Sequence, residues 1–238
     1  MKEKISVVTA CIGGRDSLFE DQVVDDAHFI AYVDNITTSS VWEQRLAHGN
    51  FISSRRNSRI HKILIHQYVD TEYSLWMDAN IKLLVPARQL VDEWLDGHDI
   101  AILKHRLREC IYQEAEVCAT RHLDSPALIQ EQVQSYRKQN FPENQGLAEA
   151  CLILRRHNRA VENFNNAWWS EYCRYSARDQ ISLMVAAQKS SVSIRLVTPV
   201  RFENPYFYSE SRPPTMEQKG AFRSVNDRND AVACVAPF

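Results

Sequence analysis

The segment 73–81, with the sequence YSLWMDANI, has the residue types and spacing best suited to chemistry in this chain. Its apolar residues predict a buried strand, and Asp78 and Asn80 follow at the end of that strand. Ligands of α/β proteins bind outside the carboxyl ends of the strands, so these two side chains are placed to meet one. Their oxygens suit Mg²⁺, Mn²⁺ or a ribose. The alternative is a turn, since Asp and Asn after strands often bond to the local backbone.

A second set of candidate residues is a row of cations on the predicted helix 55–69. At 100° per residue, four basic side chains fall within about 60° of one another: Arg55, Arg59, Lys62 and His66. The helix leads into the strand that ends at Asp78, so we expect the cations to lie near that carboxylate. Cations beside a metal-binding carboxylate can hold a diphosphate. The alternative is a solvated basic face on an amphipathic helix.

The segment 104–114 contains a third set of candidates. Like Asp78, His105 and Arg108 follow a short apolar run, so we expect them at the same edge of the sheet. His105 has the chemistry to orient a hydroxyl, bind a phosphate or serve as a ligand, and a hydrogen-bonded structural role is the alternative. Arg108 and Glu114 have the spacing for a pair on the surface of a helix.

A fourth set lies at the start of a late helix predicted over 177–188. Arg178, Asp179 and Gln180 combine a cation, a carboxylate and an amide, which are the donors and acceptors that sugar hydroxyls need. Ser176 followed by Asp179 also has the form of a capping box, in which Asp179 reaches back to the backbone. Both roles can coexist, because the cap does not use Arg178 or Gln180.

Length and composition indicate an ordinary globular protein. The chain has 238 residues, of which 45% are hydrophobic and 24% charged, and its net charge is −2. This balance gives no general attraction to nucleic acid. The six cysteines lack metal-binding spacing, so we expect reduced thiols, as in a cytosol. We find no signal peptide or bilayer-spanning stretch, so we expect a soluble, cytoplasmic protein, and peripheral membrane contact stays open.

The elements that must position these candidates alternate along the chain. Strands are predicted over residues 5–10, 28–33, 75–77, 100–103, 151–154 and 192–197. Helices are predicted over 55–69, 86–95, 109–120, from Ser125 as N-cap onward, 158–172 and 177–188. Such alternation predicts an α/β fold with a mostly parallel sheet flanked by helices. We expect one domain over residues 1–238, in which residues 199–238 wrap the surface or close a site.

The order of these motifs resembles the glycosyltransferase-related domain of plant TOD/MUCI-type proteins and of bacterial proteins linked to surface glycans. The resemblance runs from about residue 5 to residue 183 and is most specific at two blocks, Trp76–Asn80 and Arg178–Gln180. It implies a GT-A fold, which is a Rossmann-like sandwich that binds a nucleotide-sugar at the strand ends.

The resemblance also implies a set of site residues. The nucleotide-sugar would be bound by Thr9, Asp34, Arg59, Lys62, Asp78, Asn80, Arg108, Arg178 and Gln180. Within this set, Thr9 and Asp34 would meet the nucleobase and ribose. Asp78 and Asn80 take the place of the metal-binding Asp-x-Asp motif, which implies a divalent cation, Mn²⁺ or Mg²⁺. Because Asn80 replaces the usual Asp, metal affinity would be weak and Lys62 or Arg59 would carry more of the diphosphate charge.

The catalytic residues implied by the resemblance are Asp179, Glu149 and His105. One of the two carboxylates would act as general base if the anomeric centre is inverted, or would orient the donor if configuration is retained. We therefore expect a glycosyltransferase that moves a sugar, from a UDP-sugar in the first instance, to a glycan, lipid-linked glycan or other hydroxyl acceptor in surface polysaccharide synthesis. The alternatives are a nucleotidyltransferase or hydrolase on the same scaffold, and a non-catalytic glycan-binding or assembly module.

Overall fold

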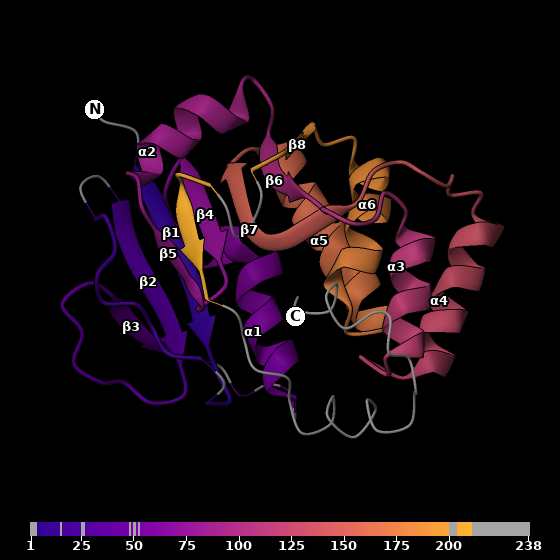
Figure 1. Cartoon of the computed structure of the whole chain (residues 1–238), viewed down its shortest axis with the longest axis horizontal. Coiled ribbons are helices and arrows are strands. Elements are labelled where there is room, and N and C mark those ends of the chain that lie inside the picture. The colour runs from indigo at the N-terminus through magenta and orange to yellow at the C-terminus, as the bar shows by residue number, and fades with distance from the viewer. Residues whose placement is uncertain are drawn as a thin grey trace.

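The structure of this protein is a computed structural model that describes residues 4–14, 16–24, 27–47, 49, 51, 53–199 and 204–210. Its centre is a seven-stranded sheet with the strand order β3-β2-β1-β4-β7-β6-β8 (Figure 1). The strands of this sheet are β1 (Ile5–Cys11), β2 (Ala27–Val33), β3 (Glu43–Leu46), β4 (Tyr73–Met77), β6 (Ile100–Lys104), β7 (Ala148–Arg156) and β8 (Ile194–Val197).

The direction of the strands confirms the predicted α/β class with a mostly parallel sheet. Strands β1, β2, β3 and β4 pair in parallel, and β6 pairs in parallel with β8. Strand β7 lies between β4 and β6 and is antiparallel to both. The amino end of β7 therefore meets the carboxyl ends of its two neighbours. We call this side of the sheet the carboxyl edge.

Helices cover both faces of the sheet. They are α1 (Ser54–Ile63), α2 (Ala87–Leu90), α3 (Ile111–Thr120), α4 (Pro126–Lys138), α5 (Arg159–Arg174) and α6 (Asp179–Ser190). Residues of α1, α5 and α6 share one apolar core with Trp76 and Ile153 of the sheet. Helices α3 and α4 pack on the outer side of α6, at the end of the molecule opposite β2 and β3 (Figure 1). None of the described helices is long and apolar enough to cross a membrane.

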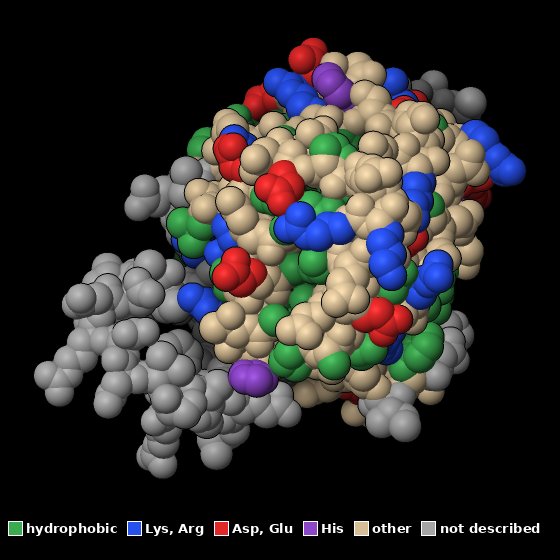
Figure 2. Space-filling model, turned by 90° about the vertical axis from the view of Figure 1, so that its right-hand side faces the viewer, with side chains coloured by type: hydrophobic (Ala, Val, Ile, Leu, Met, Phe, Trp, Pro, Cys, Tyr) green, Lys and Arg blue, Asp and Glu red, His purple; other side chains and the backbone are tan. Residues whose placement is uncertain are grey.

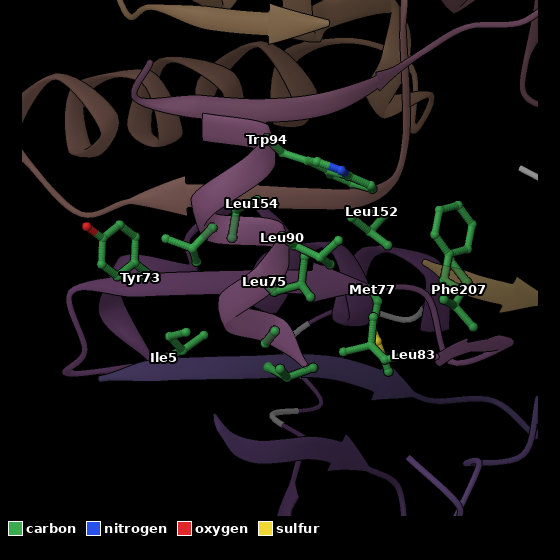
Figure 3. Packing of buried hydrophobic residues seen from close by; sticks show 14 of the residues in the cluster. Ile5, Tyr73, Leu75, Met77, Leu83, Leu90, Trp94, Leu152, Leu154 and Phe207 are labelled. Carbon is green, nitrogen blue, oxygen red and sulfur yellow. The ribbon is translucent and has the colours of Figure 1, made fainter. Parts of the chain in front are cut away.

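The opposite face of the sheet has its own core. Leu75 and Met77 alternate with Trp76 along β4 and point to this second face. They pack against Leu90 of α2 and against Trp94 in the π-helical turn Val91–Leu95 that continues α2 (Figure 3). A separate two-stranded sheet of β5 (Ile81–Leu83) and β9 (Phe207–Ser209) completes this layer. Burial on both faces explains why β4 reads as a continuous apolar run.

Several predicted boundaries were wrong. The helix predicted over 55–69 ends at Ile63 and is followed by a 3₁₀ turn, Ile65–Gln67, so His66 leaves the row of cations. Strand β3 was missed because its sequence, EQRL, has no apolar alternation and is held at the sheet edge by backbone pairing with β2. Of the predicted segment 199–238, only residue 199 and residues 204–210 lie within the described part of the chain.

The loop after β1 is fixed at the carboxyl edge by one side chain and one close contact. The Gly13 N–H donates a hydrogen bond to Asp34 Oδ2, 2.6 Å away, just beyond β2. Gly13 has a φ of +83°, and a Cβ added there would lie 2.9 Å from Cβ and Oγ of Ser54 at the start of α1. A side chain at position 13 would thus be both strained and crowded.

We therefore expect Gly13→Ala to lower the free energy of unfolding by about 2–4 kcal/mol, from left-handed strain plus overpacking. Gly14→Ala is the matched control, because Gly14 has a φ of +65° and open space around it. It should cost only the strain, about 1–2 kcal/mol. Urea unfolding of both variants measures the difference, and equal losses would contradict the crowding at Ser54.

Candidate functional site

The carboxyl edge brings together side chains from distant parts of the sequence. The Asp78 N–H donates to the Cys151 carbonyl at 2.9 Å, and the His105 N–H donates to the Leu147 carbonyl at 2.7 Å. Residues 147–151 therefore lie between the end of β4 and the end of β6. Glu149 is within this stretch and is buried. Helices α1 and α6 both begin at this edge, since each runs back toward the start of the next strand.

The Asp179 carboxylate is the centre of a buried ion cluster. Its Oδ2 lies 2.7 Å from Lys62 Nζ and 2.9 Å from Arg59 Nε. The side chains of Lys62 and Asp179 are only 2% and 7% exposed. Burial alone would raise the pKa of Asp179, but the attraction of Lys62 and Arg59 outweighs it and holds that pKa well below its ordinary value. Asp179 is therefore a fully ionised carboxylate with two cationic partners.

Asp78 joins this cluster from the end of β4. Its Oδ1 accepts a hydrogen bond of 3.2 Å from Trp76 Nε1, and both Arg59 and Lys62 lie close enough to interact with it electrostatically. We call Arg59, Lys62, Asp78 and Asp179 the ion cluster. Of the predicted row of cations, Arg59 and Lys62 thus lie near both predicted carboxylates.

A second buried group adjoins the ion cluster through Arg178. Glu114 is 1% exposed and accepts a hydrogen bond of 2.7 Å from Arg108 Nε. Its other oxygen lies 3.9 Å from Arg178 Nη2. The expected pair of Arg108 and Glu114 exists, but in the interior and not on a helix surface. Glu114 holds Arg108 and Arg178 at the same edge as Asp179.

The contacts of His105 favour a structural role over the catalytic role that we expected. Its Nδ1 accepts hydrogen bonds from the backbone N–H groups of Leu107 and Arg108, at 3.2 and 3.0 Å. Burial, supported by the charges of Arg108 and Arg106, lowers the pKa of His105 to about 4 despite the opposing effect of Glu114. The ring is therefore neutral at physiological pH and shapes the loop after β6.

The predicted capping box at α6 was wrong. The helix begins at Asp179 with Arg178 as its N-cap, and no side chain caps it. Ser176 instead donates a hydrogen bond of 2.5 Å to Gln132 Oε1 of α4. A buried carboxylate gains more from two cations than from one backbone N–H group, so Asp179 points to Lys62 and Arg59.

The four remaining predicted residues occupy different environments. Thr9 is fully buried within β1, its hydroxyl has no hydrogen-bond partner among the described residues, and its expected contact with a nucleobase stays a prediction. Asp34 is exposed and orders the Gly13 loop at the rim of the edge. Gln180 is buried in the first turn of α6, next to Asp179. Asn80 Nδ2 donates a hydrogen bond of 2.6 Å to the Glu210 carbonyl.

The expected divalent cation has two candidate ligands, Asp78 and Asn80. The amide nitrogen of Asn80 is used on Glu210, so only its amide oxygen has the chemistry of a metal ligand. Nowhere in the described ranges do three or more His, Cys, Asp or Glu side chains form a group able to hold an ion. Asp78 and the amide oxygen of Asn80 therefore fit an ion whose other ligands come from a bound diphosphate and water.

Two residues that support the ion cluster were not assigned a role from the sequence. Trp76 stands two positions before Asp78 and so faces the same side of β4, which is the signal that predicts their contact. Arg155 is fully buried, and its Nη2 donates a hydrogen bond of 3.2 Å to the Lys62 carbonyl. The sequence signal for Arg155 is that a charged residue directly follows the apolar run 151–154. Burial lowers the pKa of Arg155 to about 9.

The surface contrasts with this buried concentration of charge. On the face shown in Figure 2, acidic and basic side chains are interspersed and form no broad patch of one sign.

Comparison with known proteins relates this chain to glycosyltransferases. A family model described as "TOD1/MUCI70, glycosyltransferase-like domain" matches residues 4–204. The probable hexosyltransferase MUCI70 of Arabidopsis thaliana is 28% identical over 187 residues, which are 68% of this chain and 32% of that protein. The chain thus spans about a third of this relative's length. The apo structure of the bifunctional glycosyltransferase WbbM aligns with a TM-score of 0.48 and 11% identity, over 83% of this chain and 39% of that one.

The buried pairing of Asp179 generates a stability prediction. Asp179→Asn leaves Lys62 and Arg59 without their shared carboxylate, so we expect it to lower the free energy of unfolding by about 3–5 kcal/mol. Glu109→Gln is the control, because it removes a carboxylate from an exposed pair with Lys104 and should cost less than about 1 kcal/mol. Urea unfolding at neutral pH measures both, and equal costs would refute the buried pairing.

The same pairing predicts a dependence on acid pH. The folded-state pKa of Asp179 lies below its unfolded value of about 4, so its stabilisation is present above that value and is lost as the pH falls further. Wild-type protein should therefore lose more stability than Asp179→Asn between about pH 5 and pH 2.

Proposed function

The chain belongs to the TOD1/MUCI70 glycosyltransferase-like family, and on that premise we propose that it transfers a hexose or related sugar from a nucleotide-diphosphate donor to a hydroxyl group of a glycan or lipid-linked glycan. The observation that carries this proposal is the excess of positive charge at the carboxyl edge.

That excess can be counted within the site. Arg55 and Arg178 act electrostatically on the ion cluster, so four cations surround the two carboxylates Asp78 and Asp179. Adding Arg108 with its partner Glu114, and the buried Glu149, leaves an excess of one positive charge. Buried charge without compensation is costly, so such a site favours an anionic ligand. The diphosphate of a nucleotide-sugar carries about two negative charges, which is the sign of charge that this excess attracts.

The same cations have a role in the reaction itself. When the bond between sugar and diphosphate breaks, negative charge develops on the departing nucleoside diphosphate. Cations that are already fixed in place stabilise this charge without reorganising. Lys62 and Arg59 are held in place by Asp179, and Arg178 is held by Glu114. We assign the leaving-group stabilisation to these three residues.

If the reaction inverts the anomeric centre, a carboxylate on the acceptor side has to accept the proton of the acceptor hydroxyl. Asp179 is poorly suited to be a general base, because Lys62 and Arg59 lower its pKa and occupy one of its oxygens. We therefore assign Asp179 to positioning the cations. Glu149, at the start of β7 between the ends of β4 and β6, is the carboxylate that we propose acts on the acceptor hydroxyl. It would be the general base if the reaction inverts the anomeric centre.

Donor binding tests the proposal directly. A thermal-shift panel of UDP-, GDP-, CMP- and dTDP-sugars should identify a nucleotide-diphosphate sugar that stabilises the protein, by about 2.7 kcal/mol at 100 times its Kd. Arg59→Gln should weaken binding of that donor by about 1.5–3 kcal/mol, the range for hydrogen bonds to charged groups. Arg159→Gln is the control, because Arg159 is 85% exposed at the start of α5. Stabilisation by none of the sugars would refute the proposed function.

Metal dependence has its own test. We propose that a divalent cation binds at Asp78 and Asn80 together with the donor, because the described residues form no group of three or more candidate ligands. Mn²⁺ without nucleotide should leave the melting temperature unchanged, and Mn²⁺ with the preferred nucleotide should raise it beyond the nucleotide alone. Asp78→Asn should remove this additional shift. A large shift from Mn²⁺ alone would contradict the shared site.

A further inference from the structure

The hydroxyl group of Tyr172 is a buried polar group at the site that none of the contacts above explains. Tyr172 lies near the end of α5, and its side chain has an exposed fraction of 0%. Its Oη has no hydrogen-bond partner among the described residues. Buried tyrosine hydroxyls usually find a partner, because leaving one without a bond costs stability. Such a position suggests that the partner is a molecule other than the protein.

The surroundings of this hydroxyl are those of the ion cluster. Arg59 and Asp179 lie close enough to Tyr172 to act on it electrostatically, together with Arg55 and Arg56. Burial, supported by Asp179 against the opposing arginines, raises the pKa of Tyr172 to about 12. The group is therefore a neutral O–H donor among cations, at the point where the charge excess favours an anion.

The ring of Tyr172 is held firmly in this orientation. It stacks on Trp169 with ring centroids 5.5 Å apart and an angle of 25° between the planes. The Arg56 guanidinium lies over the same ring, 5.3 Å from its centroid, and also donates to the Tyr172 carbonyl at 3.4 Å. These two contacts hold the ring in place, so the position of the hydroxyl is fixed without a hydrogen bond of its own.

A second buried donor lies in the same region. Gln180 follows Asp179 in α6, is 2% exposed, and its Nε2 also has no hydrogen-bond partner within the described residues. Two buried donors without partners, one beside the cations and one on the residue that follows Asp179, fit a ligand with several acceptor oxygens, which is what a diphosphate provides.

We propose that Tyr172 is a donor-binding residue whose hydroxyl donates a hydrogen bond to an oxygen of the nucleotide-sugar diphosphate. This inference rests on the proposed function and adds a neutral contact to the cationic ones. The cations neutralise the charge of the diphosphate, and the hydroxyl, whose ring is held by packing, fixes the position of one diphosphate oxygen.

Tyr172→Phe tests the proposal, with inorganic pyrophosphate and UDP as probes. The variant keeps the ring and its packing, so its melting temperature should equal or exceed that of wild type, because a buried hydroxyl without a partner is removed. Its affinity for pyrophosphate, measured by calorimetry, should fall about tenfold or more. Pyrophosphate isolates the diphosphate contact from any preference for a base or a sugar.

Tyr136→Phe is the matched control. Tyr136 is also fully buried, but its hydroxyl accepts from Gln132 and donates to Glu171, both at 3.0 Å. Removing that hydroxyl should lower the melting temperature and leave pyrophosphate affinity unchanged.

Three results would count against the proposal in distinguishable ways. Equal affinity of wild type and Tyr172→Phe for both probes would overturn the role of Tyr172 and leave the proposed function standing. An equal loss of affinity in Tyr172→Phe and Tyr136→Phe would show a general effect of core substitution and overturn it as well. A wild-type protein that binds neither pyrophosphate nor any nucleoside diphosphate would overturn the inference and the proposed function together.

Discussion

The arrangement of the carboxyl edge depends on one buried carboxylate that is shared by two cations. Asp179 and Lys62 are 117 residues apart in the sequence, and their contact joins α6 to α1 across the end of β4. Burying an ionised carboxylate is costly unless cations compensate it, and burying Lys62 is costly for the same reason. Each helix must therefore be packed on the sheet for the charged side chain of the other helix to be buried and paired. The ion pairs at this edge and the packing of α1 and α6 on the sheet therefore depend on each other.

The antiparallel strand β7 explains how a mostly parallel sheet obtains an additional carboxylate at this edge. A parallel strand contributes to the carboxyl edge only as it ends, as β4 does with Asp78. Because β7 runs the other way, it contributes as it begins, and the stretch around Glu149 enters between the ends of β4 and β6. Carboxylates from strands of opposite direction thus reach the same edge.

The sequence predicted the parts of this structure that local pattern determines. The apolar runs located β1, β2, β4, β6 and β7, and the position of Asp78 after β4 followed from them. Local pattern could not predict contacts between residues far apart in the sequence. Ser176 and Asp179 have the spacing of a capping box, but Asp179 pairs with Lys62 and Arg59, which are distant in the sequence. Strand β9 was missed for the same reason, since three residues become a strand only through pairing with β5. The environments of Thr9 and His105 likewise depend on neighbours that no motif specifies.

The bond between Asn80 and Glu210 has a consequence for the order in which the molecule forms. It spans 130 residues, and with the pairing of β5 and β9 it completes the layer directly after Asp78. Contacts of such long sequence separation form late, because the chain between them must be ordered first. During synthesis, the sheet strands β1 to β8 emerge from the ribosome before residue 210 does. A nascent chain can therefore assemble its central sheet while the edge of β5, with its unpaired backbone groups, still awaits its partner.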